Sequence, residues 1–338
     1  MVAVPLAPAA EISVDSSLVR ALVQSQFPEA SAFALGDRYE GADCVTWRLG
    51  TDWAVRLSRR QATADMQETE LTWLPRFAPT LPCATPAPVR IGAPSALYPW
   101  RWSIVRWIPG RSHHEQPLSA HGARDLGVAL RALHQAAPPE APRNAWRSTS
   151  LLQRGAKAQR RLDVLTTLAA GSAWRLDREA ALAMYARGAH ATRGPATWTH
   201  LDLHCGNVLT TGGRLAGIVD WVHAGAGDGA ADLGQAMVLL PPSHWDHLID
   251  GYGPLDVATF DRARAEALTY ALILATTPSA PFTAAGWTGL VSLGIAHRAH
   301  ATSPRPMPAA PPAPASPPYG VPTASAGSTH AAGLVPVG

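Results

Sequence analysis

Three oxygen-bearing side chains in the second half of the chain have the types and the spacing that phosphoryl transfer needs. Asp202 lies two residues after His200, Asn207 follows five residues later, and Asp220 follows after a further thirteen. Phosphoryl transfer requires a carboxylate that receives the proton of the acceptor hydroxyl, and oxygen ligands that hold Mg²⁺ on the nucleotide phosphates. We therefore predict that Asp202 is the catalytic base and that Asn207 and Asp220 are the metal ligands.

Each of these side chains also has an ordinary structural explanation. An Asp can cap a turn, and an Asn after a glycine or an Asp at a strand end is common in turns. Such explanations treat the three residues separately, whereas phosphoryl transfer accounts for their order and spacing together. The Walker A sequence of P-loop nucleotide-binding proteins is absent, and Lys157 is the single lysine of the chain.

The composition indicates a globular protein rather than a nucleic-acid binder. The chain has 338 residues, 47% of them apolar, which is enough for one large or two ordinary domains with a substantial core. The formal net charge is only +3, and no dense basic run occurs, so nucleic acid is not an expected partner.

Cysteine usage and apolar runs bear on the expected compartment. Cys44, Cys83 and Cys205 are too few and too widely spaced to suggest a disulfide framework or a zinc site. We expect a reducing, cytoplasmic environment. The first residues lack a secretory signal, and no apolar run is long enough to span a bilayer, so no membrane partner is expected.

Hydrophobic periodicity predicts the elements that must position the three residues. The first third of the chain reads as a helix, a hairpin turned at Gly50, a second helix, a Pro-rich loop and a strand. The remainder is mostly helical, with one short strand pair turned at Gly212 and Gly213. The predicted ranges are helices 15–27, 61–77, 118–136, 150–170, 177–190, 232–240, 243–251 and 256–276, strands 45–49, 53–57, 102–107, 208–210 and 215–221, and the loop 79–99.

This order of elements predicts an α+β fold with two lobes. Residues 1–108 are expected to form a small β-rich lobe, and residues 109–302 a larger helical lobe. Residues 303–338 are rich in Pro, Ala and Ser with almost no charge, so we expect a disordered tail there.

With these motifs in order, the chain resembles the aminoglycoside phosphotransferase family over roughly residues 30–300. The resemblance implies a bilobal protein-kinase-like fold, ATP or GTP as the phosphoryl donor with Mg²⁺, and a hydroxylated small molecule as the acceptor. The matching segments are the catalytic loop from His200 to Asn207, the metal strand Ile218 to Trp221, Gly227 to Leu233, Trp53 to Leu57, Glu70 to Pro75, and Trp102 to Gly110.

The resemblance also implies roles for residues upstream of the catalytic loop. Arg56 stands where protein kinases carry a lysine, and it would grip the α- and β-phosphates through its planar guanidinium fork. Glu70 on the following helix would hold Arg56, with Glu68 as the nearby competitor. Asp43 either belongs to the loop that covers the phosphates or caps a turn.

Three further residues are expected to support the catalytic loop rather than react. His200 and Asp232 would brace it by hydrogen bonds, and His204 could either brace the loop or contact substrate. The chain also departs from the family pattern. Relatives often carry Trp and Asn where Ala42 and Cys44 stand, and Pro is usual in place of Cys205.

An aminoglycoside-type antibiotic is the first expected acceptor, with a macrolide or another natural product or metabolite as the alternative. A polycationic drug would favour an acidic cleft on the helical lobe, whereas an apolar cleft would favour a macrolide. Four carboxylates are available for an acidic cleft, namely Asp246, Asp250, Asp256 and Glu266.

Two other classes of protein were considered. The glycine-rich segment from Gly225 to Ala230 fits the relaxed dinucleotide-binding fingerprint, which would indicate an NAD(P)-dependent oxidoreductase. It starts four residues beyond Trp221, no second β-α unit follows, and it leaves the Asp202, Asn207 and Asp220 pattern unexplained. The changed residues Ala42 and Cys44 instead raise a kinase-shaped binding protein without catalysis.

Overall fold

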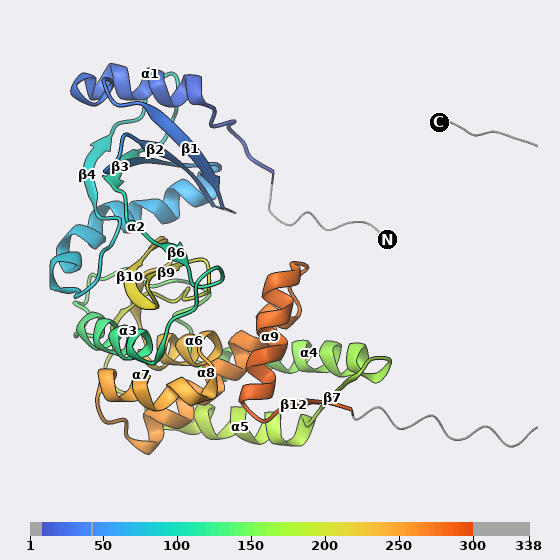
Figure 1. Ribbon diagram of the computed structural model, residues 1–338. Coiled ribbons are helices and arrows are strands. Elements are labelled where there is room, and N and C mark those ends of the chain that lie inside the picture. The colour runs from blue at the N-terminus through green and yellow to red at the C-terminus, as the bar shows by residue number, and fades with distance from the viewer. Residues whose placement is uncertain (1–8, 42, 300–338) are drawn as a thin grey trace, which may run out of the picture. The chain divides into compact units, whose positions relative to one another are not determined.

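An antiparallel sheet dominates the N-terminal part of the computed structural model, which describes residues 9–41 and 43–299 (Figure 1). Two helices accompany the sheet, α1 (Ser16–Gln26) and α2 (Gln61–Phe77). The five strands lie in the order β1 (Leu35–Glu40), β2 (Cys44–Leu49), β3 (Trp53–Ser58), β5 (Trp102–Arg106) and β4 (Pro88–Gly92).

Local sequence signals set the ends of these elements. The Asp15 carboxylate accepts a hydrogen bond of 2.9 Å from the Leu18 N–H and caps α1. Gly50 has φ +63°, a left-handed conformation that closes the β2–β3 hairpin as predicted. The expected helix 61–77 is also confirmed.

The predicted Pro-rich loop 79–99 is wrong in part, because it contains the edge strand β4. Pro88 begins this strand. An edge strand pairs with a neighbour on one side only, so it tolerates a proline, which has no backbone N–H to donate. A run of prolines favours a loop locally, but proline is excluded only from central strands.

Seven α-helices follow among the described residues, and α8 contacts four of the others, α4, α5, α6 and α9. The helices α3 and α7 pack side by side (Figure 1). The bounds are α3 (Ala120–Leu133), α4 (Leu151–Ala170), α5 (Arg178–His190), α6 (Ala230–Leu239), α7 (Trp245–Tyr252), α8 (Val257–Ala275) and α9 (Ala280–Ser292), with 3₁₀ turns at Pro28–Ala30, Ala78–Thr80 and Pro242–His244.

Helix α9 was not predicted. Its sequence contains Gly286 and Gly289, and glycine lowers intrinsic helix stability by about 1 kcal/mol relative to alanine. Packing explains the glycine, since a Cβ on Gly286 would lie only 2.2 Å from the backbone nitrogen of Ala275 on α8. Tertiary contact therefore decides a helix that propensity disfavours.

Short strands connect the helices. They form one three-stranded sheet, β10-β9-β6, and two pairs, β11 with β8 and β12 with β7. Their bounds are β6 (Arg111–Ser112), β7 (Trp174–Leu176), β8 (Thr197–Thr199), β9 (Val208–Thr211), β10 (Arg214–Ile218), β11 (Gly225–Gly227) and β12 (Ala296–Arg298). The predicted β9–β10 hairpin is present, but β10 ends at Ile218, so Asp220 lies beyond the strand.

Buried hydrophobic side chains form two clusters. One joins α1 to the N-terminal sheet, and the other fills the helical part and also takes in Leu74 and Phe77 from α2. The predicted boundary after residue 108 stays a prediction, because the contacts group the described residues as one unit. The expected tail 303–338 and Ala42 lie outside the described residues. Within the described part, no helix is long and apolar enough to cross a bilayer.

Candidate active site

One buried cation joins the N-terminal sheet to the segment after β10. Arg56 on β3 places its Nη2 at 2.6 Å from Asp220 Oδ1 and 3.3 Å from Glu70 Oε2. The same Glu70 Oε2 also accepts a hydrogen bond of 3.1 Å from the backbone N–H of Trp221. Only 7% of Arg56 is exposed, so these contacts stand in place of water.

One guanidinium thus serves two carboxylates. Burial acts to lower the pKa of Arg56, but the negative charges, Glu70 first, raise it above its usual value, so the guanidinium stays charged. Burial also raises the pKa of Glu70, more than Arg56 lowers it. Of the two glutamates considered, Glu70 reaches Arg56, while Glu68 forms a surface ion pair of 2.7 Å with Arg101.

Asp202 lies on the loop between β8 and β9, where Arg147 and His223 flank its carboxylate. Arg147 donates from Nη1 to Asp202 Oδ1 and also, at 2.6 Å, to the carbonyl oxygen of Leu201. His223 Nε2 lies 3.7 Å from Asp202 Oδ2. Burial would raise the pKa of Asp202, but Arg147, and then His204 and His223, lower it overall, so the carboxylate is ionised.

Asp232 at the start of α6 holds the backbone of this loop. Its two carboxylate oxygens accept hydrogen bonds of 2.7 Å from the N–H groups of His200 and Leu201. The Nε2 of His134 lies 3.1 Å from Asp232 Oδ2. His200 is fully buried, with its Nε2 3.1 Å from the carbonyl oxygen of Val219, so both residues sit where bracing requires.

Two non-glycine residues at this site adopt the left-handed region. Leu201 has φ +65° and Asp220 has φ +64°. Such backbone conformations cost on the order of 1–3 kcal/mol and persist only where surrounding contacts impose them. Here the bonds from Asp232 to the loop and from Arg56 to Asp220 supply those contacts.

The donor set of Asn207 and Asp220 fits Mg²⁺. Asn207 is buried and donates from Nδ2 to the carbonyl oxygen of Asp202 at 2.9 Å, which directs its Oδ1 away from that bond. Its own carbonyl accepts from the Val219 N–H at 2.9 Å, next to Asp220. No group of three or more His, Cys, Asp or Glu suited to a metal occurs among the described residues. Mg²⁺ commonly takes one or two protein ligands and completes its shell with phosphate and water.

The remaining predicted residues lie around this centre. Asp43, just before β2, pairs with Arg60 at 3.2 Å, and burial, followed by the charge of Asp220, raises its pKa. His204 Nδ1 accepts from the Gly206 N–H at 3.0 Å, and its ring packs edge-on against Phe282. His204 is therefore part of the loop turn.

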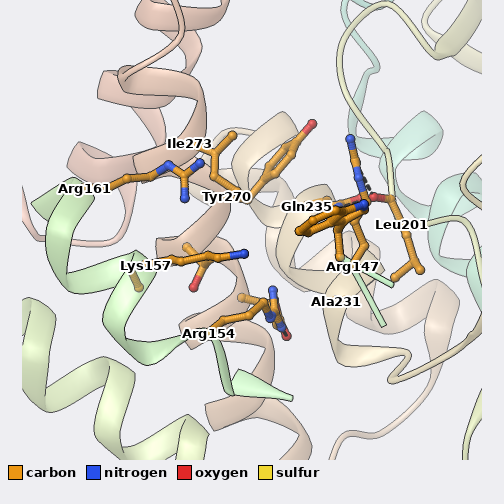
Figure 2. Close-up of a pocket in the computed structure, with 13 residues that line it drawn as sticks. Arg147, Arg154, Lys157, Arg161, Leu201, Ala231, Gln235, Tyr270 and Ile273 are labelled. Atoms are coloured by element: carbon orange, nitrogen blue, oxygen red, sulfur yellow. Dashed lines mark hydrogen bonds and ion pairs between the residues drawn. The ribbon is translucent and has the colours of Figure 1, made fainter. Parts of the chain in front are cut away.

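A cavity of about 290 Å³ lies beside the catalytic loop, between α4 and α8 (Figure 2). Its size is near the lower end of the range for small-molecule sites. It is lined by Trp146, Arg147, Arg154, Lys157, Ala158, Arg161, Leu201, Ala231, Gln235, Glu266, Thr269, Tyr270 and Ile273. Of the four carboxylates considered for an acidic cleft, only Glu266 is among them.

Sequence reasoning missed several residues at this site. Arg147 and His223 flank Asp202, and Gln235 bonds the loop backbone by accepting from the Leu203 N–H at 2.7 Å. None of these belongs to a motif with Asp202, and they come from separate segments.

The cavity cations on α4 did carry a signal, since Arg154, Lys157 and Arg161 recur at helical spacing.

A family model described as the phosphotransferase enzyme family matches residues 39–268. That match spans β2 to β5 of the sheet, including Arg56, and continues through the loop from His200 to Asn207 into α8. No curated protein sequence matches the chain.

Solved structures of antibiotic phosphotransferases share the fold. The GDP complex of aminoglycoside 2'-phosphotransferase-IIIa aligns with TM-score 0.61 at 16% identity, covering 83% of this chain and 99% of that one. Macrolide 2'-phosphotransferase MphH from Brachybacterium faecium aligns with TM-score 0.53 at 20% identity, covering 81% and 98%. The streptomycin-ATP-APH(2")-IIa ternary complex aligns with TM-score 0.50 at 16% identity, covering 78% and 90%. At such identities the likeness establishes the fold, a sheet-rich N-terminal part followed by a helical part.

Proposed function

Because this chain belongs to the phosphotransferase enzyme family, we propose that it transfers the γ-phosphoryl group of a Mg²⁺-bound nucleotide to a hydroxyl of a small molecule. The observation that carries the proposal is the 2.6 Å contact between Arg56 Nη2 and Asp220 Oδ1. It brings a cation suited to phosphate oxygens next to a carboxylate suited to Mg²⁺, although the two residues are 164 positions apart.

The proposed reaction uses few groups. The acceptor hydroxyl oxygen forms a bond to the γ-phosphorus, the bond from that phosphorus to the β-phosphate oxygen breaks, and the nucleoside diphosphate leaves. Asp202 orients the hydroxyl and receives its proton. Arg56 binds phosphate oxygens, and Glu70 keeps its side chain in place. Asn207 and Asp220 would hold Mg²⁺, which neutralises phosphate charge when bound.

The structural relatives suggest candidate donors and acceptors. They include a GDP complex and an ATP complex, and they are named for the aminoglycosides or macrolides that they modify or bind. We propose ATP or GTP as the donor and a cytoplasmic site of action. An aminoglycoside or macrolide antibiotic is the acceptor suggested by this likeness, which would make the protein a resistance enzyme.

Two alternative functions were raised by the sequence, an oxidoreductase and a binding protein without catalysis. An NAD(P)-dependent oxidoreductase is wrong, because the segment Gly225–Gly227 forms an antiparallel pair with β8 rather than a parallel βαβ unit, and the family is that of phosphotransferases. A kinase-shaped binding protein without catalysis would conflict with membership of an enzyme family. The kinetic experiment below distinguishes it directly.

The test compares Asp202→Asn with the matched control Asp246→Asn on the exposed surface of α7. Asp202→Asn should lower turnover on the order of 10²–10⁴-fold, since the base is lost, while nucleotide affinity stays near that of the wild type. Asp220→Ala should instead weaken Mg²⁺-nucleotide binding itself. Nucleoside diphosphate release measures turnover, and calorimetric titration measures affinity.

Wild-type turnover by Asp202→Asn would remove the assigned base. Nucleotide binding that is unchanged in Asp220→Ala would remove the assigned metal ligand. If the wild-type protein bound nucleotide but released no diphosphate with any hydroxylated acceptor, a binding protein would be the better conclusion.

A further inference from the structure

The charge of the cavity beside Asp202 identifies the kind of acceptor it suits. Four cationic side chains line it, Arg147, Arg154, Lys157 and Arg161, against the single carboxylate of Glu266. A site built for a polycation would show the opposite balance, because desolvated like charges repel strongly.

Two of the four cations are neutralised within the protein. Arg154 donates to Glu266, and Arg147 donates to Asp202. Among the described residues, Lys157 and Arg161 make no ion pair with a carboxylate. Lys157 instead lies over the ring of Trp146, 5.0 Å from its centre. Burial, followed by the neighbouring charge of Arg160, lowers the pKa of Arg161.

The helix geometry aims these charges at one place. Arg154, Lys157 and Arg161 occupy positions i, i+3 and i+7 of α4, so they share a face. Figure 2 shows all three extending from that helix toward the side of Tyr270 and Ile273 on α8. An anion between the helices would meet Lys157 and Arg161 together.

The same cavity lies next to Asp202, although Asp202 itself does not line it. Leu201, which lines the cavity, directly precedes Asp202, and Arg147, which also lines it, donates to the Asp202 carboxylate. A hydroxyl held near Asp202 and an anionic group near Lys157 and Arg161 could therefore belong to one small molecule.

We propose that the acceptor is a small hydroxylated molecule with an anionic carboxylate or phosphate group, bound between α4 and α8 by Lys157 and Arg161. This inference rests on the proposed phosphotransferase function, and its anionic acceptor replaces the antibiotic that the structural likeness suggests. The anionic group lies at the α4 wall, and the reacting hydroxyl lies at Asp202. Arg147 then has a second possible partner besides Asp202 once the acceptor is bound.

The experiment uses hexoses that differ mainly in charge. Glucuronate, glucose 6-phosphate, glucose and glucosamine are titrated into the full-length protein with a non-hydrolysable Mg²⁺-ATP analogue, and heat of binding is measured. We expect the two anionic sugars to bind about tenfold or more tightly than glucosamine, which corresponds to about one charge-assisted hydrogen bond. The two anionic sugars distinguish a carboxylate site from a phosphate site.

The variant Lys157→Gln with Arg161→Gln should lose this preference, and Lys157→Glu should shift it toward glucosamine. Arg160→Gln is the matched control, because Arg160 is an exposed neighbour on α4 that does not line the cavity. It should bind all four sugars as the wild type does. Thermal unfolding of each variant checks that the helix remains folded.

Three results would overturn the inference. They are tighter binding of glucosamine than of both anionic sugars, equal binding of the anionic sugars by wild type and double variant, and no detectable binding of any sugar. Binding of the ATP analogue is recorded in the same samples. If the wild-type protein does not bind the ATP analogue, the phosphotransferase proposal is refuted. If it binds the analogue but shows no preference for anionic sugars, the acceptor class alone is refuted.

Discussion

The cation on β3 and the cations on the cavity face of α4 are held in different ways. Arg56 is buried against Glu70 and Asp220, and its charge is compensated before any ligand arrives. Lys157 and Arg161 line a cavity without carboxylate partners among the described residues. The first arrangement suits a part of the reaction that is the same in every turnover, the phosphate chain. The second leaves charge for whichever acceptor the cavity binds.

The same contrast has an energetic side. A compensated buried cation is costly to remove, since its partners stay behind as unpaired charges. A cation at a cavity edge contributes to binding but little to folding. Replacements of the same type on the two sides should therefore separate stability from acceptor affinity.

The largest effect is expected from Arg56→Met compared with Arg161→Met. Arg56→Met leaves Glu70 and Asp220 without a counter-charge and should lower the free energy of unfolding by about 3–5 kcal/mol. Arg161→Met should change it by less than about 0.5 kcal/mol. Urea titration measures both, and Arg38→Met, which breaks a surface pair with Glu40, is the control. Equal costs at Arg56 and Arg161 would abolish the contrast.

A smaller loss is expected from Asp232→Asn. The carboxylate holds the N–H groups of His200 and Leu201, and an amide offers only one oxygen for them. The free energy of unfolding should fall by about 1.5–3 kcal/mol, and turnover should fall with it because the loop is less well positioned. Asp246→Asn serves as the control. An unchanged free energy of unfolding would show that the Asp232 carboxylate does not stabilise this loop.

Arg147 lines the cavity and is also compensated by Asp202, and Arg147→Gln tests its effect on that carboxylate. Removing the guanidinium should raise the pKa of Asp202 toward its ordinary value. As the pH falls, the base should then become protonated, and activity should be lost, at a higher pH than in the wild type. The acid limb of kcat/KM against pH should therefore move upward in pH. The pKa of Asp202 is lower in the folded than in the unfolded state, so its ionisation stabilises the fold at pH values above the unfolded-state pKa. That contribution to the free energy of unfolding disappears as the pH falls through the folded-state pKa. A limb that does not move, while Arg160→Gln also leaves it in place, would show that Arg147 does not control the base.

The smallest effect is expected from Trp146→Ala. Trp146 is 74% exposed and its ring lies against Lys157, so the folded state should be almost unaffected. Loss of the cation–π contact should free Lys157 to move and weaken acceptor binding by about 0.5–1 kcal/mol. Calorimetry with glucuronate measures the change, with nucleotide affinity as the internal control. A loss of stability above 1 kcal/mol would place Trp146 with the structural residues.

Pattern reading recovered the fold where the signal was local. The Gly50 hairpin, the Asp15-capped helix and the amphipathic helix after β3 depend on neighbouring residues, and each formed as predicted. Strand β4 and helix α9 depend on distant partners, β5 and α8, and their prolines and glycines misled the local rules.

Sequence alone determined the order and chemical types of Asp202, Asn207, Asp220, Arg56 and Glu70, because motif spacing and strand pattern are carried by short stretches of chain. Only the tertiary structure decided that Arg56 is shared by two carboxylates and that Arg147 covers Asp202. It also decided the sign of charge in the cavity, because the sequence left both an acidic and an apolar cleft open. Packing of α4 against α8 brings together charges from distant segments, and no local pattern encodes which helix faces meet.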